Sequence, residues 1–146
     1  MDGAVGLDPA AAYYVYDFWA DTLVGKLPGT ATLEQVLGPK HCAMLSVRKA
    51  QAVPQVLSTS RHLLQGWVDL AEVQWDGPSQ RLGGVAQVIG GEPFKIVLAG
   101  NGRRAVRVAA EGARAKLEPH PAGPELGVVV LERPDNGPVA WRAEFE

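Results

Sequence analysis

The last eight residues, Val139-Ala140-Trp141-Arg142-Ala143-Glu144-Phe145-Glu146, decide the fold class. Val139, Trp141, Ala143 and Phe145 are apolar, and the residues between them are small or charged. Successive side chains of a β-strand point to opposite faces, so apolar residues at every second position predict a strand with one buried and one solvated face.

Turn-forming residues divide the rest of the second half into similar short stretches. Pro134-Asp135-Asn136-Gly137-Pro138 follows an apolar run at residues 126–133, and Glu111-Gly112 and Asn101-Gly102 separate earlier runs. Asn and Gly tolerate positive φ and are typical of tight turns. The spacing predicts a sequential antiparallel meander in which each strand pairs with the next through a hairpin.

The first half has the same rhythm. We expect strands at residues 13–19, 23–27, 31–36, 42–47, 67–75 and 82–89, with breaks at Pro28-Gly29, Gly38-Pro39 and Asp76-Gly77-Pro78. Gly83-Gly84 indicates a bulge or a close approach of backbone within the last of these strands. About ten short strands without a long helix fit a sandwich or a barrel, and we predict a two-sheet antiparallel β-sandwich over residues 13–146, preceded by a flexible segment at residues 1–12.

The net charge and the hydrophobic pattern argue against nucleic acid and membranes as partners. The chain has 146 residues, 47% of them hydrophobic, and a formal net charge of −2. This charge provides no global field for nucleic acid or for an anionic membrane, and no apolar run approaches the roughly 20 residues of a membrane helix. No signal peptide is visible, so we expect a cytoplasmic protein. The single cysteine, Cys42, lies in an apolar stretch and is expected to be a buried, inert thiol.

Few residues suggest chemistry. The three histidines are widely separated, so neither a metal site nor a cofactor is expected. Asp17, Asp69, Glu72 and Asp76 are the available carboxylates for glycosidic cleavage, but turns and polar strand faces explain them better. Trp67 and Trp75 are candidates to stack on sugar rings if they are exposed, whereas Trp141 is expected in the core because it lies on the apolar face of its strand.

Three stretches carry a family resemblance. The first is Tyr14-Val15-Tyr16-Asp17-Phe18-Trp19, followed by Leu23-Val24-Gly25-Lys26-Leu27. The others are Leu37-Gly38-Pro39-Lys40-His41-Cys42-Ala43-Met44-Leu45 and Pro54-Gln55-Val56-Leu57-Ser58-Thr59-Ser60-Arg61-His62-Leu63-Leu64-Gln65-Gly66. In order and spacing they resemble the C-terminal β domain of melibiase-type α-galactosidases and their raffinose-synthase-like relatives. The resemblance covers residues 13–75, and the second half is similar only as generic strands.

The resemblance implies a non-catalytic role. In that family the catalytic aspartates belong to an upstream (β/α)₈ barrel, and none of them has a counterpart here, so we expect no catalytic residue in this chain. The implied role is that of an accessory domain that packs against and stabilises the barrel of a parent glycoside hydrolase. It makes Arg61, His62 and Gln65 candidates for a domain-interface loop and Trp19 a candidate for the domain core.

Two alternatives remain open. A carbohydrate-binding module would use exposed tryptophans to bind an oligosaccharide, and a free-standing protein-interaction sandwich would have a different partner or form a homodimer. Calorimetric titration with melibiose, raffinose and galactan separates the first alternative from the accessory domain. The oligomeric state addresses the second.

Overall fold

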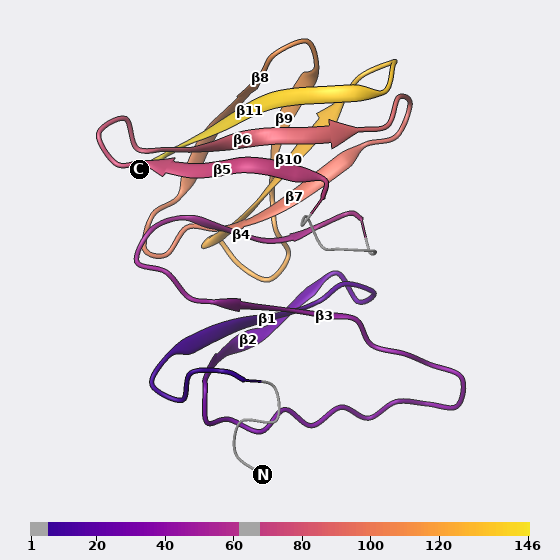
Figure 1. The fold of residues 1–146 in the computed structure, drawn as a ribbon, viewed down its shortest axis with the longest axis vertical. Helices are drawn as coiled ribbons and strands as arrows, with labels where there is room; N and C mark the ends of the chain where they lie inside the picture. Colours follow the sequence, from indigo (N-terminus) through magenta and orange to yellow (C-terminus); the bar gives the residue numbers. More distant parts are fainter. Residues whose placement is uncertain (1–5, 62–67) are drawn as a thin grey trace. The chain divides into compact units, whose positions relative to one another are not determined.

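The computed structural model of this chain describes residues 6–61 and 68–146. These residues form eleven antiparallel strands and no helix, as Figure 1 shows. The all-β class predicted from the alternating residues is therefore confirmed. Accordingly, the described part of the chain contains no helix long and apolar enough to span a bilayer.

The chain divides after Ala50 into two compact units. The first contains strands β1 (Ala12–Asp17), β2 (Thr22–Pro28) and β3 (Leu45–Lys49), hydrogen-bonded in the order β2-β1-β3. The strand expected at residues 31–36 is absent, so that prediction was wrong. Of those six residues only Leu33 is partly shielded from solvent, so no buried face is available to hold the segment in a sheet.

The second unit is a sandwich of two four-stranded sheets. Its strands are β4 (Gln55–Thr59), β5 (Leu70–Asp76), β6 (Arg81–Val88), β7 (Phe94–Ala99), β8 (Ala105–Ala110), β9 (Arg114–Pro119), β10 (Leu126–Glu132) and β11 (Gly137–Phe145). One sheet has the order β4-β7-β10-β9 and the other β5-β6-β11-β8. Phe94, Ile96 and Val129 from the first sheet pack with Trp141 and Phe145 from the second in one buried core.

The β11 strand behaves as its alternation predicts. Val139, Trp141, Ala143 and Phe145 are all buried, and Trp141 is only 3% exposed. These side chains all point from β11 toward the facing sheet, because they occupy every second position of the strand. The prediction that Trp141 lies in the core is confirmed.

The predicted meander was right for β9 and β10, which pair with each other, and wrong for the other three connections from β7 to β11. Strand β7 and strand β8 belong to different sheets, as do β8 and β9, and β10 and β11. The Asn-Gly, Glu-Gly and Asp-Asn-Gly turns therefore carry the chain from one sheet to the other instead of closing hairpins. The most apolar strands, β7 and β10, pair with each other at the centre of their sheet, and β10 pairs on its other side with its sequence neighbour β9.

The Gly83-Gly84 pair marks a close approach of backbone, as predicted. A Cβ on Gly84 would lie 2.8 Å from the carbonyl oxygen of Ala71. The register irregularity lies in the partner strand β5, between Ala71 and Gln74, where Glu72 has a φ of 54°. This bulge changes the alternation of β5, so Ala71 and Val73 are exposed while Trp75 packs against the core.

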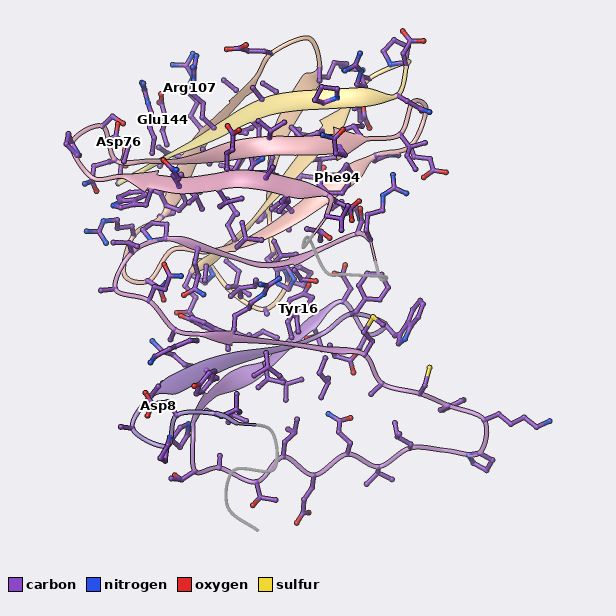
Figure 2. The ribbon with its side chains drawn as sticks, viewed as in Figure 1. Asp8, Tyr16, Asp76, Phe94, Arg107 and Glu144 are labelled. Carbon is purple, nitrogen blue, oxygen red and sulfur yellow. The ribbon has the colours of Figure 1, made fainter. Side chains whose placement is uncertain are left out.

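One row of charges crosses the sheet that contains β11. Asp76, Arg81, Glu144 and Arg107 are successive partners in the strand registers, and their signs alternate. Figure 2 shows Asp76, Glu144 and Arg107 on this sheet. Arg81 Nη2 lies 2.8 Å from Glu144 Oε1. Such cross-strand pairs of opposite charge favour this register over a shifted one.

Candidate functional site

Exposed apolar side chains gather around one hollow of the first unit. Trp19 is 56% exposed, Leu37 is 52% exposed and Val36 is fully exposed. The hollow has a volume of about 480 Å³. Its lining residues are Asp17, Trp19, Gln35, Val36, Leu37, Lys40, His41, Cys42 and Ala43. Two of the three stretches that carry the family resemblance therefore meet at this surface, which we call the Trp19 hollow.

The turn between β1 and β2 holds Trp19 outward. Asp17 Oδ1 accepts a hydrogen bond from the backbone N–H of Ala20 at 3.1 Å, and the N–H of Asp21 donates to the carbonyl of Phe18 at 3.3 Å. The Phe18 ring packs edge-to-face against Trp19, with 4.8 Å between ring centroids. Hydrogen bonds thus hold the backbone of the turn, and the Phe18 ring packs against the indole.

The long segment after β2 completes the hollow. The backbone N–H of Phe18 donates to the carbonyl of Met44 at 2.9 Å, which ties the Trp19 turn to the end of this segment. A turn at its tip is closed by a 3.1 Å hydrogen bond from the N–H of His41 to the carbonyl of Gly38. One backbone hydrogen bond therefore joins the Trp19 turn to the end of the long segment, and a second closes a turn within that segment.

A buried tyrosine forms a hydrogen bond to the same turn. Tyr16 is 1% exposed, and its hydroxyl donates to Asp21 Oδ1 at 2.7 Å. Burial, followed by the hydrogen bond and the charge of Asp21, raises the pKa of Tyr16 well above its usual value of 10.0. The phenol is consequently neutral at physiological pH and remains a hydrogen-bond donor.

This tyrosine predicts a loss of stability in alkali. The folded chain holds the Tyr16 proton more tightly than the unfolded chain, so its contribution is complete below about pH 10 and decreases as the pH rises above that value. We expect the free energy of unfolding of the wild type to fall more steeply above about pH 10 than that of Tyr16→Phe. At neutral pH the variant should lose about 1 kcal/mol, because one hydrogen bond is removed. Urea denaturation across the pH range measures both, and parallel pH profiles would contradict the prediction.

Two expectations about this unit are corrected. Trp19 was expected in the domain core and Cys42 as a buried thiol, but both are exposed. Trp19 follows the end of β1 and so belongs to a turn, and Cys42 precedes β3 in the long segment. Both residues lie outside the strands, so neither side chain belongs to a buried sheet face.

The predicted interface loop is only partly described. His62 and Gln65 lie outside the described residues. Arg61 Nη1 forms an ion pair with Glu92 Oε2 at 3.1 Å, and its guanidinium lies 5.9 Å from the centre of the Phe94 ring. Arg61 is thus held by residues of its own unit, and a role of these three residues in a domain interface stays a prediction.

Of the two tryptophans proposed for sugar stacking, the structure describes only Trp75. Trp67 lies outside the described residues. Trp75 is half-buried, packs edge-to-face on Phe145 with 5.7 Å between centroids, and has the Arg103 guanidinium 5.4 Å from its ring centre. Arg103 is in turn held by Gln80 Oε1 at 3.0 Å. Sugar stacking on Trp75 stays a prediction and would compete with this cation–π contact.

The carboxylates singled out in the sequence have structural roles at different places in the fold. Asp17 belongs to the Trp19 turn, Glu72 forms the bulge of β5, and Asp76 accepts a hydrogen bond from the Ser79 hydroxyl. Among residues 6–61 and 68–146, no group of three or more His, Cys, Asp or Glu side chains is placed to hold a metal ion.

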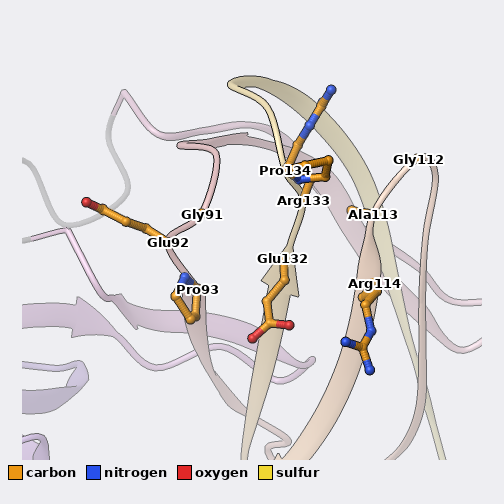
Figure 3. Close-up of a pocket in the computed structure, with 9 residues that line it drawn as sticks. All are labelled: Gly91, Glu92, Pro93, Gly112, Ala113, Arg114, Glu132, Arg133 and Pro134. Atoms are coloured by element: carbon orange, nitrogen blue, oxygen red, sulfur yellow. The ribbon is translucent and has the colours of Figure 1, made fainter.

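A second hollow opens at one end of the sandwich and has a volume of about 520 Å³ (Figure 3). Its lining comes from the loops before β7 and β9 and from the end of β10: Gly91, Glu92, Pro93, Gly112, Ala113, Arg114, Glu132, Arg133 and Pro134. Figure 3 shows the carboxylates of Glu92 and Glu132 pointing in different directions. The sequence marked Gly112 and Pro134 as turn residues, but no signal in it brought these nine residues together, because they come from three separate loops.

Comparison of the chain with protein-family models, with curated proteins and with solved structures gave no match.

Proposed function

We propose that this chain is a non-catalytic accessory domain of an α-galactosidase-like glycoside hydrolase, and that it docks on a catalytic (β/α)₈ barrel and stabilises it. The observation that carries the proposal is the Trp19 hollow. There, Trp19 from one stretch that resembles the melibiase β domain and Leu37 from another are both exposed around a single surface.

The chemistry of this surface suits a protein partner. Contiguous exposed apolar surface marks interaction sites in soluble proteins. Tryptophan is among the residues that contribute most to binding when it inserts into a partner, and Trp19 is presented by a fixed turn, so little conformational entropy is lost on docking. Asp17 and Lys40 lie on the same lining and provide charges of both signs at the rim.

The non-catalytic part of the proposal is supported by the placement of the carboxylates. Glycoside hydrolysis needs two carboxyl groups facing one bond, about 5–9 Å apart. The carboxylates in the end hollow point apart, and Glu92 is already paired with Arg61. In this proposal the bond-breaking residues belong to the barrel of the parent enzyme.

Trp19→Ala tests the docking surface. We expect the purified chain to bind a melibiase-type catalytic barrel prepared without its own β domain, and the variant to bind at least about 30-fold more weakly, as for an interface hot spot worth 2 kcal/mol or more. Because Trp19 is exposed, its removal should change the free energy of unfolding of the free chain by no more than about 0.5 kcal/mol. Isothermal titration calorimetry measures the affinity, and urea denaturation the stability.

Val24→Ala is the matched control, because Val24 is 39% exposed in the same unit but does not line the hollow. It should bind the barrel as the wild type does. Equal affinity of wild type and Trp19→Ala would refute docking through the hollow. A stable homodimer without affinity for the barrel would favour a free-standing interaction protein.

A further inference from the structure

The hollow at the end of the sandwich contains a pair of opposite charges that do not bond to each other. Glu132 on β10 and Arg114 on β9 are direct partners in the strand register, so their side chains emerge on the same face. Both side chains are exposed, and neither forms a side-chain hydrogen bond or ion pair with another described residue, while the charge of nearby Lys116 attracts that of Glu132. Figure 3 shows their charged groups side by side on neighbouring strands.

The other charged residues of the hollow are already held. Glu92 is paired with Arg61 at 3.1 Å, and Arg133 Nη1 donates to the carbonyl of Pro138 at 3.0 Å. The Arg133 guanidinium also lies 3.1 Å from the place where a Cβ on Gly137 would stand. The Arg133 Nε has no hydrogen-bond partner among the described residues but is buried, so the exposed charged groups that remain for a ligand are one carboxylate and one guanidinium.

The size and lining of the hollow define what would fit. Its volume of about 520 Å³ falls within the range of small-molecule sites, roughly 300–1,000 Å³. Pro93, Pro134 and Ala113 add apolar C–H surface around the two charged groups. The Glu132 carboxylate would repel a small anion, and the Arg114 guanidinium would repel a small cation.

We propose that this hollow binds a neutral oligosaccharide. Adjacent hydroxyls of a sugar ring both accept and donate hydrogen bonds, so one can accept from the Arg114 guanidinium while its neighbour donates to the Glu132 carboxylate. The C–H face of the ring would lie against the proline and alanine side chains. This site is independent of the Trp19 hollow and uses no tryptophan.

The test is titration of the ¹⁵N-labelled full chain with maltose, lactose, melibiose and raffinose, followed by NMR. At least one sugar should shift the backbone amides of residues 91–92, 112–114 and 132–133. Glu132→Gln and Arg114→Met should each weaken that binding about tenfold or more, because each removes a charged hydrogen-bonding partner.

Glu118→Gln is the matched control. Glu118 lies on the same face of β9, and its carboxylate is already paired with Lys116. This variant should bind the sugar as the wild type does. Trp19→Ala should also bind the sugar normally although it weakens docking on the barrel, so failure of one proposal can be distinguished from failure of the other. The proposal is overturned if no sugar shifts these amides, if all variants bind equally, or if glucuronate or glucosamine binds more tightly than every neutral sugar.

Discussion

Replacing Phe94 by alanine is expected to lower the free energy of unfolding by about 3–5 kcal/mol. Phe94 is fully buried at the start of β7 and packs in the core between the two sheets of the second unit (Figure 2). Truncation would remove its apolar contacts, leave a cavity between the sheets, and take away the ring that faces the Arg61 guanidinium. Urea denaturation followed by tryptophan fluorescence measures the change.

Ile89→Ala provides the comparison, since Ile89 is 43% exposed in the loop that leads to β7. It should change the free energy of unfolding by no more than about 0.5 kcal/mol. If Phe94→Ala does not fold, Phe94→Leu, which leaves a smaller cavity, should still be destabilised relative to Ile89→Ala. Equal stability of the Phe94 and Ile89 variants would show that the core does not lie between these sheets.

A second large loss of stability is expected for Gly100→Ala. Gly100 opens the turn that carries the chain from β7 to β8 and so from one sheet to the other. A Cβ at this position would overlap the carbonyl oxygen of Arg103 and lie 2.8 Å from its carbonyl carbon. The obstacle is backbone, so the turn itself must move, and we expect a loss at or above the upper end of the roughly 1–3 kcal/mol typical of overpacking.

Gly102→Ala, in the same turn, separates steric overlap from backbone strain. A Cβ on Gly102 would meet nothing within 4 Å, but its φ of 88° is unfavourable for alanine. This variant should therefore lose only about 1 kcal/mol. Thermal and urea denaturation of the two variants give the comparison, and a larger loss for Gly102→Ala would contradict the described geometry of the turn.

Strand positions could be predicted from the sequence, whereas strand partners could not. The alternation at residues 139–145 is a local property, and it identifies both the strand and its buried face. The Asn101-Gly102 turn signals that the chain reverses, but a reversal is compatible with pairing to the preceding strand or with crossing to the facing sheet. The choice depends on the pairing of β7 with β10, which are separated by β8 and β9 in the sequence.

The candidate sites were visible in the sequence only where they coincide with a motif. The stretch that ends at Trp19 stood out through the family resemblance, but its apolar composition indicated the core instead of an exposed turn. Glu132 and Arg114 are ordinary charged residues in the sequence, and their juxtaposition depends on the β9–β10 register. The ion pair of Arg61 with Glu92 likewise joins residues 31 positions apart.

The most direct test is the half-life of a heated melibiase-type barrel that lacks its own β domain, followed by hydrolysis of p-nitrophenyl α-galactoside. Addition of the chain should lengthen that half-life, because a ligand that binds only the folded barrel stabilises it, while Trp19→Ala should have little effect. The chain alone should hydrolyse nothing. An unchanged half-life, or turnover by the stringently purified chain alone, would contradict the account.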